Sequence, residues 1–347
     1  MVMINKSDKI IVGISIGDLN GIGVEVILKT FQDNRMLDFC TPLIFGSTKV
    51  ISYHKKALSI ETPIHGITSL NQIHHNKINV LNIWKEDVSI NLGKASAESG
   101  EYAAKSLEKA VSSLKDKKID ILLTAPINKE TIQSDSFNFP GHTEYLEDKL
   151  DGKSLMILMS DNLKIGLITG HIPISKVAET ITPSLIIEKV ETMYRSLVED
   201  FGINRPKIAV LSLNPHSGDK GVIGEEDDEI VKPTIDQIAD SGKLVFGPYA
   251  ADGFFGSEAY KQFDGVLATY HDQGLAPFKA LSFGNGVNYT AGLSEVRTSP
   301  DHGTGFDIAG KNIANPSSFT EALFTAIQVF KTRKEYRELS KSPLSVK

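Results

Sequence analysis

The chain has 347 residues, of which 41% are hydrophobic and 23% charged, and its formal net charge is −6. This composition is typical of a globular protein and disfavours a nucleic-acid partner, because duplex binding needs a concentrated basic surface. A single cysteine, Cys40, excludes an intrachain disulfide and a thiolate metal cluster. The N-terminal segment lacks a signal-peptide core, and no stretch approaches the roughly 18 apolar residues of a membrane span. We therefore expect a cytoplasmic protein with no membrane partner.

Short runs of β-branched and aliphatic residues alternate with helical patterns along the chain. The expected strands cover residues 9–17, 42–47, 78–83, 119–126, 155–160, 163–170, 207–214, 243–248 and 265–270. The expected helices cover residues 96–116, 183–200, 225–240 and 316–338, with Asn315-Pro316-Ser317-Ser318 as the cap of the last. This alternation predicts an α/β architecture with a largely parallel sheet. Because the chain is about twice as long as a typical domain, we expect two lobes.

Three histidines follow three of the apolar runs. "LKIGLITGH" ends at His171, "KIAVLSLNPH" at His216 and "GVLATYH" at His271. In open parallel sheets ligands bind outside the carboxyl ends of the strands, so these side chains are candidates to converge on one site. Neutral imidazoles bind zinc and other divalent ions, and three of them leave positions for water or substrate. However, a single histidine at a strand end is usually a hydrogen-bonded loop residue, and the spacing matches no compact metal motif.

Carboxylates lie near two of these positions in the sequence. Asp272 directly follows His271, and Asp252 stands in "GPYAADGFF". Either carboxylate could orient an imidazole or supply an oxygen contact to a metal.

Two further segments carry groups suited to an anion. "FPGHTEYL" places His142 and Thr143 at a helix start, where Thr143 suits an N-cap and where the same hydroxyl and amides suit a phosphate or carboxylate. "FKALSFGNGVNYTAGLSEVRTS" carries Lys279, Asn288 and Arg297. Arginine grips an oxyanion with two parallel hydrogen bonds, and lysine acts as a point charge, although both are ordinarily solvated surface residues. Each feature alone leaves structural and binding roles open.

The glycine pattern does not predict a standard nucleotide site. In "GISIGDLNGIG" the glycines depart from the G-x-G-x-x-G order, and the chain has no phosphate-loop lysine motif. A standard dinucleotide-binding fingerprint is therefore absent.

Eight segments stand in order between residues 17 and 311. They are "GDLNGIGVEV", "TAPINK", "GHTEYL", "LNPHSGDKGVIGEED", "GPYAADGFF", "YHDQGLAPFK", "VNYTAGLSEVRTS" and "DHGTGFDIAGK". Taken together, they closely resemble the 4-hydroxythreonine-4-phosphate dehydrogenase family of vitamin B6 biosynthesis. So many segments in the same order are far more specific than any one of them.

The resemblance implies a two-lobed α/β fold like that of the isocitrate and isopropylmalate dehydrogenases, with an active-site cleft between the lobes, in a homodimer. We expect one lobe to comprise residues 1–130, completed by residues 300–347, and the other to comprise residues 131–299 and to carry the metal and substrate ligands. The resemblance also implies a metal site shared between subunits. We expect His171 to face His216 and His271 across the interface.

The resemblance further implies a role for each matching position. The metal ligands are His171, His216 and His271, and the substrate contacts are His142, Thr143, Lys279, Asn288 and Arg297. Candidates for orienting or catalytic roles are Asp252, Asp272 and Lys279. "HGTGFDIAGKNIANP" looks like the loop with which the β-decarboxylating dehydrogenases hold NAD. The candidate cofactor contacts are therefore His302, Gly303, Thr304 and Asp307. One departure is Leu19-Asn20, where the family usually shows Pro followed by a small residue.

The implied reaction is the oxidation and decarboxylation of 4-phosphooxy-L-threonine to 3-amino-2-oxopropyl phosphate. It uses NAD or NADP and one divalent metal per site (Zn, Mg, Mn or Co). A rival of the same chemistry is a paralogous dehydrogenase of phosphorylated threonate or erythronate. A rival of another class is a three-histidine metallohydrolase, which would leave "HGTGFDIAGK" without a role. A non-catalytic metal-binding protein would also leave Lys279 and Arg297 without a role. The general base remains open between Lys279 and Asp272.

Overall fold

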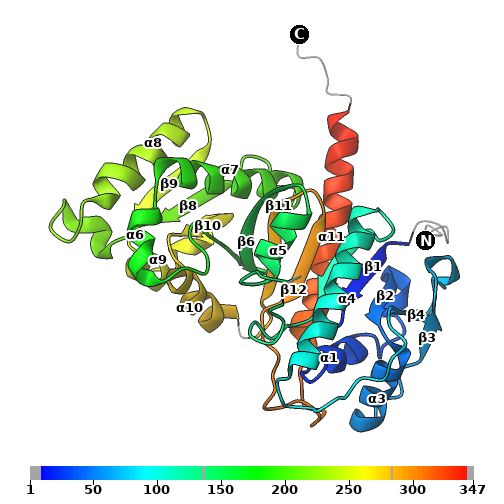
Figure 1. Cartoon of the computed structure of the whole chain (residues 1–347). Coiled ribbons are helices and arrows are strands. Elements are labelled where there is room, and N and C mark those ends of the chain that lie inside the picture. The colour runs from blue at the N-terminus through cyan, green and yellow to red at the C-terminus, as the bar shows by residue number, and fades with distance from the viewer. Residues whose placement is uncertain (1–8, 135–136, 283, 342–347) are drawn as a thin grey trace. The chain divides into compact units, whose positions relative to one another are not determined.

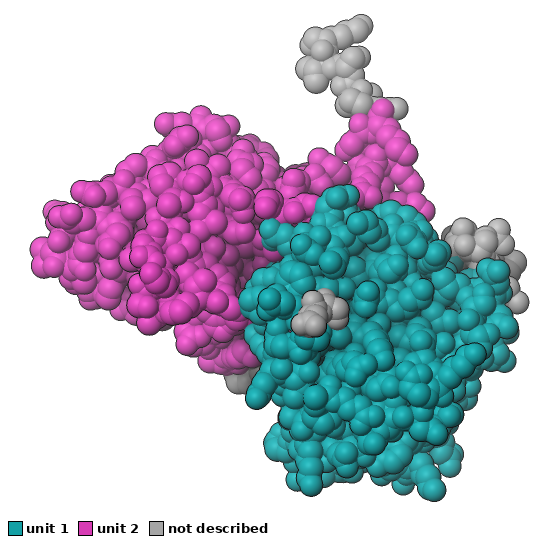
Figure 2. Space-filling model, viewed as in Figure 1, with its two compact units in different colours: residues 1–151, 294–327 teal, residues 152–293, 328–347 magenta. Residues whose placement is uncertain are grey.

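The structure is a computed structural model that describes residues 9–134, 137–282 and 284–341 (Figure 1). The chain divides into two compact units (Figure 2). Unit 1 comprises residues 1–151 and 294–327, and unit 2 comprises residues 152–293 and 328–347. Among the described helices, none has the length and apolar character needed to cross a membrane.

The sheet of unit 1 has six strands, and every neighbouring pair runs parallel. Their order is β3 (Ile64–Ile67), β4 (Ile78–Asn82), β2 (Thr41–Gly46), β1 (Ile11–Ser15), β5 (Ile121–Thr124) and β12 (Val296–Pro300). The larger helices of this unit are α1 (Gly23–Thr30), α3 (Thr48–Leu58), α4 (Ala97–Lys115) and α5 (His142–Lys149). The central strands are almost continuously apolar because parallel strands are ordinarily covered on both faces.

The sheet of unit 2 combines antiparallel and parallel pairs. Its order is β11 (Val287–Leu293), β6 (Gly152–Ser160), β7 (Leu163–Leu167), β10 (Gly265–Ala268), β8 (Lys207–Leu211) and β9 (Leu244–Tyr249). The first two pairs are antiparallel and the other three are parallel. Its helices include α7 (Pro183–Glu199), α8 (Lys232–Asp240), α9 (Ala251–Gly256) and α10 (His271–Ser282), and α11 (Ser317–Ser340) is divided between the units.

The bounds of the units differ from the lobes expected from the sequence, 1–130 with 300–347 and 131–299. Residues 131–151 belong to unit 1, where a Cβ added to Gly100 of α4 would stand only 1.9 Å from the carbonyl oxygen of Thr131. The last part of α11 belongs to unit 2, where Arg333 Nε donates to Asp200 Oδ1 at 2.7 Å. Close backbone packing thus joins residues 131–151 to unit 1, and a buried ion pair joins the last part of α11 to unit 2.

All nine expected strands and all four expected helices are present. Asn315 Oδ1 accepts a hydrogen bond from the Ser317 amide at 2.9 Å, as expected of the cap of α11. Three strands were not expected, β3, β11 and β12. Strand β12, "VRTSP", is polar in sequence yet wholly buried, because neighbouring groups satisfy its side chains. Thr298 Oγ1, for example, donates to the carbonyl oxygen of Ala322 at 2.8 Å.

A buried histidine in unit 1 predicts a loss of stability in acid. His54 of α3 is 1% exposed, and its Nε2 lies 2.9 Å from the carbonyl oxygen of Leu19. Burial lowers the pKa of His54 from 6.5 to about 4. A depressed histidine pKa gives stability that is present above the unfolded pKa and is lost as pH falls from about 6.5 to about 4. The full difference corresponds to about 3 kcal/mol.

We therefore expect His54→Gln, which retains an N–H donor but does not titrate, to flatten the pH dependence of the unfolding free energy across this window. Urea denaturation at pH 7, 5.5 and 4.5 measures the effect, with His65→Gln as the control, because His65 is only partly buried. Equal slopes for His54→Gln and wild type would show that His54 already titrates normally in the folded chain.

Candidate metal and substrate site

The three strands that precede the predicted metal ligands are neighbours in the sheet of unit 2. Strand β10 pairs in parallel with β7 on one side and with β8 on the other. His171 follows β7, His216 follows β8 and His271 opens α10 after β10. The three histidines therefore leave the sheet at the same edge, as the strand-end pattern predicts.

His171 and His271 lie together in one chain. Their ring centroids are 5.4 Å apart, with an angle of 45° between the ring planes. Asp272 Oδ1 lies 2.7 Å from His271 Nδ1, which directs the other ring nitrogen, Nε2, away from the carboxylate. A carboxylate that holds one imidazole nitrogen is the usual support of a metal-ligating histidine. The pair therefore fits a borderline divalent metal, and Asp272 has the orienting position expected for it.

His216 is held in a left-handed backbone conformation. It has φ 52° and lies in the short helix η3 (Pro215–Asp219), where it begins a run of positive φ values that continues past the helix to Gly221. Both carboxylate oxygens of Asp227 accept backbone amides just before this run, from Leu213 at 2.7 Å and Asn214 at 2.8 Å. Such a conformation costs free energy in a non-glycine residue and persists only where the surroundings impose it. Asp227 therefore fixes the loop that presents His216.

No group of three metal-ligating side chains is assembled within one chain across the described residues. Two of the predicted ligands come together, and His216 does not complete a set with them. Asp252 is exposed in the first turn of α9. Within one chain, the described residues thus bring two of the three predicted metal ligands together.

In unit 1 the predicted substrate residue Arg297 is a buried cation. Its side chain is 1% exposed, and Thr124 Oγ1 at the end of β5 accepts from its Nη2 at 2.6 Å and from its Nε at 3.1 Å. Burial lowers the pKa of the Arg297 guanidinium to about 9, while the nearby Glu144 carboxylate opposes this shift. A desolvated positive charge of this kind favours an anion close to it. Glu144 was not predicted as part of the site, although it stands next to Thr143 in "GHTEYL".

Three predicted site residues each bury a polar side-chain atom with no hydrogen-bond partner among the described residues. These atoms are His142 Nε2, Asn288 Oδ1 and His302 Nε2. Burial, with smaller contributions from Arg297 and Lys129, lowers the pKa of His142 well below 6.5, so this ring is neutral. Because buried polar atoms are almost always paired in native proteins, these three positions are suited to a ligand that supplies the missing partners.

The helix start at "GHTEYL" differs in one respect from the prediction. Gly141 is the N-cap of α5, so the predicted N-cap role of Thr143 is wrong, and Thr143 lies inside the first turn. Glycine takes this position with an extended backbone that leaves the first amides without a side-chain acceptor. Lys279 is exposed near the end of α10, and Asn288 is half-buried on β11.

The predicted cofactor residues lie in the 302–310 loop of unit 1. His302 Nδ1 is 3.0 Å from the carbonyl oxygen of Gly303. A Cβ added to Gly303 would meet no heavy atom within 4 Å, so the backbone of this residue is open to a ligand. The carbonyl oxygen of Thr304 accepts the Ile22 amide at 2.9 Å, and Asp307 is exposed. The loop therefore offers an open backbone beside a histidine and an exposed carboxylate, groups that can contact a nucleotide.

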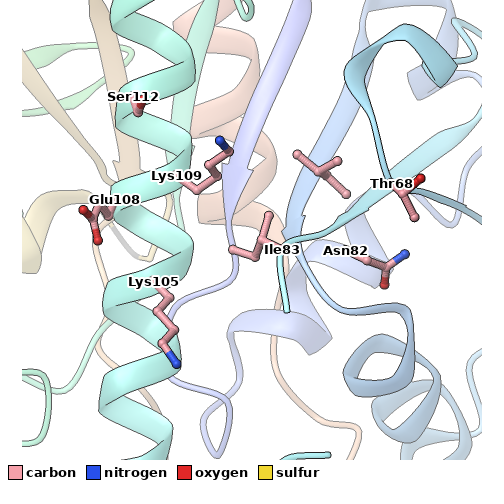
Figure 3. Close-up of a pocket in the computed structure, with 8 residues that line it drawn as sticks. Thr68, Asn82, Ile83, Lys105, Glu108, Lys109 and Ser112 are labelled. Atoms are coloured by element: carbon pink, nitrogen blue, oxygen red, sulfur yellow. The ribbon is translucent and has the colours of Figure 1, made fainter. Parts of the chain in front are cut away.

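A separate cavity of about 490 Å³ lies between α4 and the end of β4 (Figure 3). Its lining includes Lys105, Glu108, Lys109 and Ser112 from α4 and contains no predicted site residue. Lys105 is already paired with Glu101 at 2.8 Å, on the exposed surface of the helix. This cavity is therefore distinct from the predicted metal and substrate residues.

Comparison with known proteins decides the family. Residues 38–326 match the family of pyridoxal phosphate biosynthetic protein PdxA. The chain belongs to the PdxA family. It is 50% identical to a 4-hydroxythreonine-4-phosphate dehydrogenase of Bacteroides thetaiotaomicron, over 98% of this chain and 94% of that protein. It is also 35% identical to a D-threonate 4-phosphate dehydrogenase of Cupriavidus necator, over 90% of this chain and 95% of that protein.

Among solved structures, the fold is similar to that of a 4-hydroxythreonine-4-phosphate dehydrogenase from Klebsiella pneumoniae. The TM-score is 0.79 at 30% identity, and the alignment covers 93% of the present chain and 98% of the Klebsiella pneumoniae chain. This similarity confirms the predicted α/β fold. The expected family resemblance is confirmed with it.

Proposed function

We propose that this chain is an NAD-dependent dehydrogenase that oxidises and decarboxylates 4-phosphooxy-L-threonine to 3-amino-2-oxopropyl phosphate, in the biosynthesis of pyridoxal 5′-phosphate. The 50% identical relative of that name, aligned over 98% of the chain, supports the reaction. The observation that carries the proposal is the pair of His171 and His271, with Asp272 behind it, at the edge where three parallel strands end. A hydrolase would use such a pair but would have no need of the 302–310 loop.

The side chains have distinct tasks in this reaction. A divalent metal, when bound, supplies Lewis-acid stabilisation of negative charge on oxygen. His171, His216 and His271 would hold it, and Asp272 keeps the ring of His271 in one orientation. The cations Arg297 and Lys279 attract the phosphate and carboxylate of the substrate. Lys279 or Asp272 would accept the hydroxyl proton. NAD, held by the 302–310 loop, would supply the hydride acceptor, and the β-keto acid formed by the oxidation would then lose carbon dioxide.

We further propose that the metal site is shared between two chains of a homodimer. Two observations support this sharing. All three histidines leave the sheet at one edge, yet among the described residues no three metal-ligating side chains come together within one chain. The contact of His171 with His271 favours a division in which these two come from one chain. The family resemblance led us to expect His171 opposite the other two. The two divisions give different results in a subunit-mixing experiment, described in the Discussion.

Arg297→Lys tests the role of the buried cation. The substitution keeps the charge but removes the planar fork, and the two hydrogen bonds to Thr124 cannot both form in the same geometry. We expect kcat/KM to fall by about tenfold or more, because a lost charged hydrogen bond costs roughly 1.5–3 kcal/mol. The thermal midpoint of the variant is measured in parallel, to separate a folding defect from a binding defect. Unchanged kinetics in a folded variant would place Arg297 outside the substrate pocket.

A second candidate function is the oxidation of D-threonate 4-phosphate, favoured by the 35% identical relative from Cupriavidus necator. 4-Phosphooxy-L-threonine carries an amino group where D-threonate 4-phosphate carries a hydroxyl group. The experiment that tests the proposal therefore follows NADH absorbance with each compound, in the presence of NAD and a divalent ion. A higher kcat/KM with 4-phosphooxy-L-threonine supports it. Ester hydrolysis without any NADH would favour the metallohydrolase.

A further inference from the structure

We propose that Asn20 is a positioning residue for the cofactor loop, and this inference rests on the cofactor role proposed above for the 302–310 loop. The side chain of Asn20 is fully buried, at 0% exposed. It belongs to the turn between β1 and α1, in unit 1.

Both polar atoms of the Asn20 side chain, and its backbone carbonyl, are bonded to a distant segment, residues 91–96. Its Nδ2 donates to the carbonyl oxygen of Lys94 at 2.8 Å and to Ser96 Oγ at 3.2 Å. Its Oδ1 accepts the amide of Asn91 at 2.7 Å, and its carbonyl oxygen accepts the amide of Gly93 at 2.8 Å. A small residue here could provide only the last of these bonds. Asn20 therefore fixes the path of a segment without regular secondary structure.

The segment that Asn20 fixes lies directly against the 302–310 loop. A Cβ added to Gly93, which has φ +82°, would stand 2.8 Å from the carbonyl oxygen of Phe306. A Cβ added to Gly310 would stand 2.9 Å from Leu92 Cδ1. The two segments leave no room at these glycines for even one added carbon atom, so we expect a displacement of residues 92–93 to move the loop as well.

The turn itself supports the other end of the loop. The Ile22 amide donates to the carbonyl oxygen of Thr304 at 2.9 Å, and a Cβ added to Gly21 would stand 2.6 Å from the same oxygen. The loop is thus supported at Thr304 by the turn and at Phe306 and Gly310 by the 91–94 segment. Asn20 joins these two supports, so its loss should loosen both together.

The experiment compares Asn20→Ala with Asn79→Ala. Asn79 is a matched control because it is also 0% exposed in unit 1 and its Nδ2 also donates to backbone carbonyls, at 2.9 Å to Lys77 and 3.1 Å to His74. Both variants lose buried hydrogen bonds and should lose thermal stability. We expect only Asn20→Ala to raise KM for NAD, by roughly fivefold or more, because each lost bond is worth about 1 kcal/mol. KM for the phosphorylated substrate should change little in either variant.

Hydrogen exchange of the 303–310 amides, measured without any ligand, provides a readout that does not depend on the reaction. We expect faster exchange in Asn20→Ala and unchanged exchange in Asn79→Ala. If Asn20→Ala is too unstable to purify, Gly93→Ala disturbs the same support at Phe306 and should give the same two changes. Unchanged exchange in a folded Asn20→Ala chain would overturn the positioning role. Faster exchange in Asn20→Ala with an unchanged KM for NAD would show that this loop does not hold the cofactor. Failure of the wild-type chain to form any NADH would instead refute the proposed function.

Discussion

Removal of the divalent metal is expected to abolish NADH formation completely. In the proposed site, the metal held by His171, His216 and His271 is the Lewis acid, so its removal should take away the group that stabilises negative charge on oxygen. Treatment with a chelator, followed by gel filtration and metal analysis, gives the metal-free chain. Zn²⁺, Mg²⁺, Mn²⁺ and Co²⁺ are then added back separately, and at least one should restore turnover.

The control is His65→Ala, which removes a histidine of β3 in unit 1, whereas the three predicted metal ligands belong to unit 2. It should respond to chelation and to added metal exactly as wild type does, whereas His171→Ala should stay inactive whichever metal is added. Full activity in a preparation shown by metal analysis to be metal-free would contradict the site.

Mixing of inactive variants is expected to recover activity in two of three combinations. The variants are His171→Ala, His216→Ala and His271→Ala, unfolded and refolded together in pairs. If one ligand comes from the partner, a mixed dimer of that variant with either other variant contains one intact site. Random reassortment makes half of the dimers mixed, so about a quarter of all sites recover. The pair whose two ligands come from the same chain recovers nothing.

The combination of variants that recovers no activity identifies the two ligands that come from the same chain. The ring contact within one chain predicts that His171→Ala with His271→Ala stays silent. The expectation from family resemblance predicts that His216→Ala with His271→Ala stays silent. Wild type must survive the same refolding, and mixed dimers are verified with a tagged chain. Baseline activity in all three combinations, despite verified mixed dimers, would show that each site is built within one chain.

The sequence predicts the fold best where strands are apolar and helices amphipathic. Hydrophobic periodicity identifies strands such as β1 and β5 because burial on both faces requires apolar residues throughout. It does not identify β12, since Arg297 and Thr298 are buried only because Thr124 and a backbone carbonyl accept their hydrogen bonds. Partners of this kind lie far away in the chain, so no local pattern can reveal them.

The same limit applies to the candidate site. Strand-end histidines are visible in sequence, and the parallel order of β7, β10 and β8 explains why they share an edge. The pairing of His171 with His271 depends on loop geometry, which spacing does not determine. The importance of Asn20 is hidden for a similar reason, because its partners lie more than 70 residues further along the chain.

One measurement tests the central claim most directly. Wild-type chain with a divalent metal, NAD and 4-phosphooxy-L-threonine is assayed for NADH and for carbon dioxide in the same reaction. The proposed oxidation and decarboxylation predicts equal amounts of both products, with 3-amino-2-oxopropyl phosphate as the remaining one. Release of inorganic phosphate with neither NADH nor carbon dioxide would contradict the account and favour a metal-dependent hydrolase.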